Sequence, residues 1–175
     1  MRRIVTYGGG PSQQVGDVLQ SVFVAELLAP SRDLWLVSPW ISDIPVLDNR
    51  GGQFAAVLPG ASFRGLTLVD VLMAVAERGA RLHIVTRDDP ANRFVLDRLA
   101  IASQVGLDVD VRLRERIHDK GLLTDRIYLE GSMNFTYYGR ERNEEGLTVN
   151  EDADAIARAH VDFAGRFSGP GADSN

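Results

Sequence analysis

The stretch RLHIVTRDDPANRFVLDRLAIASQVGLDVDVRL, residues 81–113, decides the fold class of this chain. It opens with a short apolar run, RLHIVTR, which is typical of a strand buried on both faces. A helical pattern follows, with Pro90 at its start and Gly106 at its end, where these residue types are favoured. The run LDVDVRLRERI, residues 107–117, then predicts a second strand. A strand–helix–strand unit indicates an α/β domain with parallel strands.

The same alternation continues on both sides of this unit. Toward the N-terminus we predict a helix capped by Ser12, a buried strand in LWLVSPW at residues 34–40, and a helix over residues 66–76 that Gly79 closes. Toward the C-terminus we predict two short strands around a turn at Asp125–Arg126, a strand at residues 145–150, and a last helix from near Asn150. We therefore expect a mixed, mostly parallel central sheet flanked by helices on both faces.

Three segments carry no clear period. Residues 41–65 are rich in Gly, Pro, Asp and Asn, and an irregular stretch of this length is more often a functional loop than a linker. Glycines 8–10 resemble a phosphate-binding loop only loosely, and no strand is predicted before them, so we interpret them as the entry to the first helix. Residues 169–175 are expected to be a disordered tail, which leaves residues 1–168 as a single domain.

Composition restricts the class of protein. The chain has 175 residues, no cysteine and a formal net charge of −5. The lack of cysteine excludes disulfides and thiolate metal sites, and no apolar run approaches the roughly 18 to 20 residues of a membrane span. We therefore expect a cytoplasmic protein with no metal, no cofactor and no membrane partner. The acidic balance argues against a bulk nucleic-acid coat, although residues 111–142 are locally positive, with seven basic and five acidic residues.

Polar residues of the second half follow a spaced pattern. His118 and Lys120, the only lysine of the chain, precede Asp125; Gly131-Ser132-x-Asn134 follows, and Glu145 lies eleven residues after Asn134. This spacing resembles the HxK(x)4D…GSxN signature of the phospholipase D superfamily, and Glu145 falls where that family commonly has a glutamate. The resemblance covers Ile117 to about Asn150. It implies a phospholipase D-like domain and a single-motif, nuclease-like member of the superfamily.

The chemistry of these side chains stands beside the resemblance. A neutral imidazole at His118 can act as nucleophile or proton carrier near neutral pH. The ammonium of Lys120 is a compact charge for a phosphate oxygen, and Ser132 and Asn134 add neutral donors. Together they form a phosphodiester cradle that needs no metal. For Asp125, the resemblance implies a supporting role away from the phosphate, and the residue also suits a turn.

Other candidates surround this set. His83 and His160 are interpreted as core histidines, and Trp40 as either a core residue or a wall of the substrate groove. Arg112, Arg114 and Arg116 alternate with apolar residues before His118, so we expect all four to share one face. That face is either a basic row for a polyanionic backbone or a solvated edge. Arg140, Arg142 and the loop of residues 41–65 are further candidates for substrate contact.

A single copy of the motif has a consequence for assembly. In the phospholipase D mechanism one histidine attacks phosphorus and a second protonates the leaving oxygen. The chain has one HxK, so the resemblance implies a homodimer in which two His118 side chains face each other across a two-fold axis. It also implies that Glu145 hydrogen-bonds a histidine of the other subunit and fixes its tautomer.

The leading hypothesis is a metal-independent phosphodiesterase, a nuclease that cleaves DNA rather than RNA through a phosphohistidine. Family habit suggests restriction or defence as its setting. A phospholipase or phosphatidyltransferase is the second hypothesis, against which the missing membrane helix and basic amphipathic segment weigh. The third is a non-catalytic nucleic-acid-binding subunit of a larger complex.

Overall fold

The computed structural model describes residues 2–5, 13–56, 65–132, 134–136, 146–167 and 169. Its main feature is a seven-stranded sheet with the order β1-β9-β8-β7-β2-β5-β6. The strands are β1 (Arg2–Val5), β9 (Gly146–Asn150), β8 (Tyr128–Gly131), β7 (Gly121–Leu123), β2 (Asp33–Val37), β5 (Arg81–Thr86) and β6 (Val109–Leu113). The predicted Ser12 cap, glycines 8–10 and nearly all of the tail lie outside the described residues.

The sheet combines two directions of pairing. Strands β2, β5 and β6 pair in parallel. Strands β7, β8, β9 and β1 join antiparallel, starting from β2. The predicted α/β class with a mixed sheet is confirmed. Parallel pairing is limited to the strand–helix–strand half, however, so antiparallel pairs are more numerous than the prediction of a mostly parallel sheet implied.

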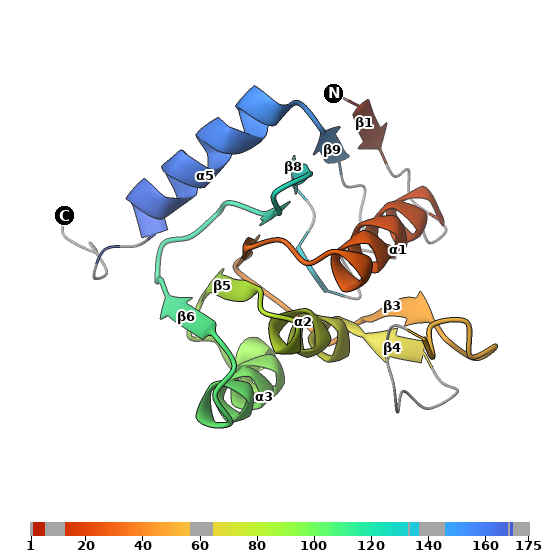
Figure 1. Cartoon of the computed structure of the whole chain (residues 1–175). Helices are drawn as coiled ribbons and strands as arrows, with labels where there is room; N and C mark the ends of the chain where they lie inside the picture. The colour runs from red at the N-terminus through yellow and green to blue at the C-terminus, as the bar shows by residue number, and fades with distance from the viewer. Residues whose placement is uncertain are drawn as a thin grey trace.

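Helices cover both faces of the sheet, as predicted (Figure 1). On one face lie α1 (Gln13–Leu28), α2 (Leu68–Glu77) and α3 (Arg93–Gln104), and on the other lies α5 (Ala153–Phe167). Strand β2 shows why both faces are needed. Its Leu34 and Leu36 are buried in the core with α1 and α2, while Trp35 and Val37 are buried against α5.

Local signals set the ends of the helices. The hydroxyl of Thr67 accepts a hydrogen bond from the backbone N–H of Asp70, and the carboxylate of Asp70 accepts one from the backbone N–H of Thr67. These two bonds form a capping box at the start of α2. Gly79 and Gly106, which follow α2 and α3, have φ of 101° and 93°. Both values suit glycine at a helix end, where the chain turns left-handed.

Two parts of the fold differ from the sequence prediction. The segment interpreted as an irregular loop contains β3 (Pro45–Asp48), which pairs antiparallel with β4 (Gly65–Thr67) in a separate small sheet. In addition, β1 precedes glycines 8–10, where no strand was expected, and pairs with β9. Residues 57–64, within the same predicted loop, lie outside the described part. Among the described helices, none combines the length and apolar character needed to cross a membrane.

The position of Gly121 generates a stability prediction. A Cβ at this buried residue would lie 3.2 Å from the Leu129 carbonyl oxygen, 3.3 Å from the Tyr128 ring and 3.5 Å from the Phe163 ring. We expect Gly121→Ala to lower the free energy of unfolding by about 1–3 kcal/mol, because the strands must separate to admit the methyl group. Urea unfolding followed by circular dichroism measures the change.

Gly165 in α5 is the matched control, since a Cβ there meets nothing within 4 Å. Gly165→Ala should leave the stability unchanged or raise it by up to about 1 kcal/mol, because alanine favours the helix. Equal urea midpoints for Gly121→Ala and wild type would show that the two strands have room to spare.

Candidate active site

The segment from Arg114 to Lys120 crosses one edge of the sheet. It leaves β6 and enters β7, and the ends of β5 and β2 lie between these two strands in the sheet order (Figure 1). The three parallel strands end at this edge, and antiparallel β7 begins there. In α/β sheets, ligands bind beyond the carboxyl ends of the parallel strands. His118 and Lys120 therefore lie where this fold class places its sites.

Contacts on both sides hold the backbone at His118. Ile117 is buried with Trp35, Val37 and α5, and its carbonyl accepts a hydrogen bond from Arg87 Nη2 at 2.8 Å. On the other side, the carboxylate of Asp119 pairs with Arg166 of α5. Residues 117–120 are not part of a strand, contrary to the expected extended run. The flanking contacts, rather than a strand ladder, define the position of His118.

The His118 side chain itself is exposed and has no hydrogen-bond partner among the described residues. Lys120 is partly buried, and its Nζ donates to the His118 carbonyl at 2.7 Å. Arg166 also contributes to the local electrostatics. Burial opposes its charge, but hydrogen bonds to Asp119 and Asp162 raise its pKa above the usual value of an arginine, so it remains a cation beside the His118 segment.

The GSxN residues reach the same edge from β8. The backbone N–H of Gly131 donates to the Lys120 carbonyl at 3.3 Å, which places Gly131 across from Lys120. Asn134 Oδ1 lies 3.3 Å from the hydroxyl of Ser38, the residue that follows β2. Phe135 is buried and bridges to Ile41, which anchors the end of this loop. Lys120 and Asn134 thus converge on the carboxyl end of β2, with exposed Ser132 between Gly131 and Asn134 in the chain.

Sequence reasoning missed three residues of this edge: Ser38, Arg87 and Asn92. Asn92 is fully buried, and its Nδ2 donates to the carbonyls of Pro39 and Arg87, while its Oδ1 accepts from the backbone of Ile41. It therefore ties the loop after β2 to the loop after β5. The available signal was position, because Ser38 and Arg87 lie at the carboxyl ends of two predicted parallel strands and Asn92 follows the second of them.

Trp40 lies at the surface rather than in the core, with 36% of its area exposed. Its Nε1 donates to Asp89 Oδ2 at 3.2 Å, and the guanidinium of Arg87 lies over its ring, 4.8 Å from the centroid. Of the two predicted alternatives for Trp40, the core position is excluded, and the side chain is exposed at this edge.

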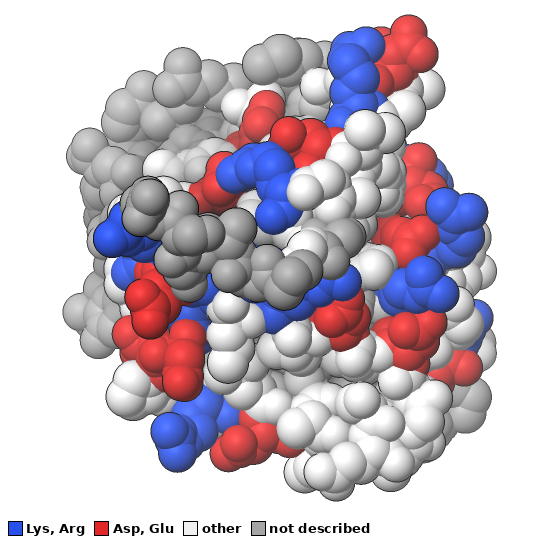
Figure 2. Space-filling model, turned by 90° about the vertical axis from the view of Figure 1, so that its left-hand side faces the viewer, with Lys and Arg blue, Asp and Glu red and all other residues white. Residues whose placement is uncertain are grey.

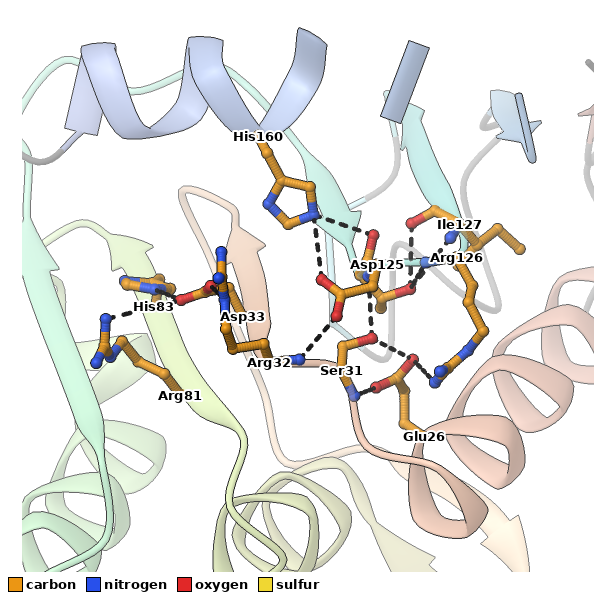
Figure 3. Close-up of polar contacts among 11 residues, drawn as sticks. Glu26, Ser31, Arg32, Asp33, Arg81, His83, Asp125, Arg126, Ile127 and His160 are labelled. Carbon is orange, nitrogen blue, oxygen red and sulfur yellow. Dashed lines mark hydrogen bonds and ion pairs between the residues drawn. The ribbon is translucent and has the colours of Figure 1, made fainter. Parts of the chain in front are cut away.

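Asp125 is not brought together with His118. It lies in the β7–β8 turn at the opposite edge, where its Oδ2 accepts from the backbone N–H of Arg32 at 2.8 Å (Figure 3). Its own N–H donates to Ser31 Oγ at 2.9 Å, and its Oδ1 lies 3.7 Å from His160 Nε2. These contacts tie the β7–β8 turn to the loop before β2, and they leave Asp125 remote from the carboxyl edge.

The other two histidines also belong to this opposite edge (Figure 3). His83 is 8% exposed, stacks on Trp35 and places Nε2 3.0 Å from Asp33 Oδ1. Burial raises the pKa of Asp33, but hydrogen bonds from His83 and Arg32 outweigh it and hold the pKa below the ordinary 3.8. His160 Nε2 lies 3.2 Å from the Thr124 carbonyl. His83 is therefore a core histidine, as predicted, whereas His160 is half-buried at the surface of α5 and contacts the turn after β7.

The predicted basic row is only partly present. Arg112 and Arg114 do share a face, but both bond the Phe167 carbonyl at the end of α5, and Arg112 also pairs with Asp110. The expectation that the row continues to His118 is wrong, because β6 ends at Leu113 and a bend follows. Arg116 is exposed and has no partner among the described residues. Arg140, Arg142 and Glu145 lie outside the described residues.

Charged residues of both signs lie on the face of Figure 2, and no metal centre is present in the described part of the chain. No group of three or more metal-ligating side chains occurs in it. Figure 2 shows basic and acidic residues interspersed on the side where β6 and α3 lie. Phe94 and Ile101 of α3, and Val105 directly after it, are exposed apolar residues.

Comparisons with known proteins agree with this geometry. A family model described as "Cardiolipin synthase, PLD-like domain" matches residues 58–166. No curated protein matches the chain. Two solved structures are similar over nearly their whole length: NucT from Helicobacter pylori (14% identity, 94% of each chain, TM-score 0.56) and Nuc, a phospholipase D family member from Salmonella typhimurium (15% identity, 92% of this chain and 91% of that chain, TM-score 0.57).

A third similar structure, the phosphatidylserine synthase of Haemophilus influenzae, is longer. At 14% identity and a TM-score of 0.58, the match covers 91% of this chain but 36% of the synthase. At these identities the structures establish a shared fold. The family model covers more than half of the chain, and it includes the carboxyl-edge residues from Arg87 to Asn134. The chain therefore belongs to the phospholipase D superfamily of phosphodiesterases.

Proposed function

We propose that this protein is a metal-independent nuclease that cleaves DNA through a phosphohistidine on His118, in an active site shared by two identical subunits. The observation that carries the proposal is the state of His118. Its imidazole is exposed at the carboxyl edge without a described partner, Lys120 Nζ bonds the His118 carbonyl, and the loop that begins at Gly131 bonds the Lys120 carbonyl. An imidazole in this state is free to attack an incoming phosphodiester.

The reaction follows from the groups at this edge. An imidazole nitrogen of His118 forms a bond to phosphorus while the bond from phosphorus to the leaving oxygen breaks. Lys120 balances charge on the non-bridging oxygens, and the Asn134 amide donates to them. Ser38 supports Asn134, since its hydroxyl lies beside Oδ1 and so turns the amide nitrogen away from β2. Water then cleaves the phosphohistidine and releases the second product.

The leaving oxygen needs a proton, and water must lose one, so a second titratable group is required. The described positions of all three histidines favour a second subunit as its source. His83 and His160 are engaged with Asp33 and Thr124 at the opposite edge, so only His118 is placed for the reaction. We therefore propose that His118 of the partner subunit is the acid and then the base. In this proposal Glu145 orients one of the two imidazoles.

DNA is proposed as the substrate on three grounds. Single-motif members of the superfamily are mostly nucleases, the segment around the motif is locally positive, and Arg116 and Trp40 are exposed along the edge. A cation and an aromatic ring suit a chain of phosphates and bases. Restriction or defence is the biological setting that family habit suggests for such an enzyme.

Removal of the nucleophile tests the reaction class. In EDTA, wild type should cleave a labelled oligonucleotide, and His118→Ala should lower the rate by at least about 10³-fold, because the covalent route is lost. A quench in alkaline denaturant should preserve a labelled phosphohistidine adduct at His118. His160→Gln, at the opposite edge, is the control and should cleave normally. The proposal is contradicted if EDTA abolishes cleavage or if the His118→Ala protein still cleaves. If the protein instead releases headgroups from phospholipid vesicles, its substrate is a lipid.

Mixed dimers test the shared site. When wild type and His118→Ala are co-expressed at equal levels with different tags, the purified heterodimer should be inactive, since each site then has one imidazole instead of two. The unfractionated mixture should retain about a quarter of the wild-type activity at equal total protein, the share of pure wild-type dimers. Half of the activity would mean that each subunit works alone.

A further inference from the structure

Arg87 is a cation of the carboxyl edge that the motif does not include. It follows β5 directly and lies beneath the segment that carries His118 across the sheet. Its Nη2 donates to the Ile117 carbonyl at 2.8 Å, and its guanidinium lies over the Trp40 ring. Two contacts from different elements thus hold the guanidinium next to the proposed nucleophile.

The charge of Arg87 is not balanced by any described carboxylate. Both of its contacts are with neutral groups, a carbonyl and an aromatic ring. Arg98, which is also half-buried, by contrast forms ion pairs with Asp43 and Asp70. The nearby carboxylate of Asp89 accepts from Trp40 Nε1 and from the backbone of Ala91 instead.

The environment of Arg87 also lowers the stability of the fold. Its Nε is buried and lacks a hydrogen-bond partner; in the described part of the chain, the only other such side-chain atom is His83 Nδ1. A partly buried cation with an unsatisfied donor lowers the stability of the fold unless a ligand uses its charge. Because Nη1 also has no described partner yet is not among the buried atoms, it reaches solvent and can donate to a ligand.

We propose that Arg87 is a second phosphate-binding cation of the active site, which receives an oxygen of a substrate phosphate on Nη1. Lys120 approaches the site from the start of β7, whereas Arg87 approaches it from the end of β5, so the two charges flank the His118 segment. The Trp40 ring and the Ile117 carbonyl keep the guanidinium in place before the ligand arrives. The inference rests on the proposed function for the identity of the substrate, but not for the anion site itself.

The salt dependence of DNA binding tests the proposal. Arg87→Gln is made in the His118→Ala background, so that a labelled oligonucleotide stays intact. Its dissociation constant should rise by about 3- to 10-fold at low salt, and the slope of log Kd against log salt should decrease by about 0.7–0.9, the effect of one lost phosphate contact. Arg87→Lys should restore most of the slope, because it keeps the charge.

Arg81→Gln is the matched control, since Arg81 opens the same strand at the opposite edge and pairs with Asp108. It removes the same charge and should leave the slope unchanged. An Arg87→Gln protein that keeps the slope of its His118→Ala parent would overturn the proposal and would leave Arg87 as a support for Ile117 alone. Thermal melting of each variant separates this result from a loss of folding.

Inorganic phosphate separates the anion site from the nuclease proposal. Phosphate should raise the melting temperature of the His118→Ala protein, and Arg87→Gln should reduce this shift where Arg81→Gln does not. If DNA is neither bound nor cleaved but the phosphate effect depends on Arg87, the nuclease proposal fails and the anion site stands. If DNA is cleaved while phosphate acts equally on both variants, the anion site fails and the nuclease proposal stands.

Discussion

The pairing of Gly121 with Val37 is the contact on which the arrangement of this molecule depends. It adds β7 antiparallel to a strand whose other neighbour is parallel, so the chain must enter β7 at the edge where β2 ends. The residues just before Gly121 are His118 and Lys120, and this requirement carries them to the carboxyl edge. Gly121 also pairs with Glu130 of β8, and a Cβ added to it would lie within 3.2–3.5 Å of three neighbouring atoms. The packing around residue 121 therefore explains why glycine follows His118-Asp119-Lys120 in the chain.

The two edges of the sheet differ in how their polar groups are paired. The amino edge of β2 is an interlocked polar network in which Asp125, Ser31 and Glu26 satisfy one another and nearby backbone groups. Most of its charged groups are paired, which is how buried polar groups avoid a desolvation penalty. At the carboxyl edge, His118 has no hydrogen-bond partner, and Arg87 has no carboxylate partner, among the residues that the structure describes. A binding site needs polar groups that the protein itself leaves unpaired, because the ligand then supplies their partners.

Much of the fold could be predicted because its signals are local. The buried run of β5, Pro90 and Gly106 around α3 and the period of α5 each depend on neighbours within a few residues. Strands β1 and β3 could not be predicted in this way. They are short, and their pairing partners β9 and β4 supply the hydrogen bonds that define them. The row of Arg112, Arg114 and Arg116 failed for a related reason, since alternation ends where the strand ends, and a bend is set by tertiary contacts.

For the site, the sequence alone determined the family: the spacing of His118, Lys120, Ser132 and Asn134 resembles the signature of the superfamily that the family model then matched, and spacing is a property of the chain. Only the tertiary structure decided what surrounds them. It brought Ser38 to Asn134 across 96 residues and Arg87 to Ile117 across 30, and it placed Asp125 at the far edge. Such contacts depend on strand order and on the direction in which β7 joins the sheet. A linear pattern does not encode either, because hydrogen-bonded neighbours in a sheet need not be neighbours in the chain.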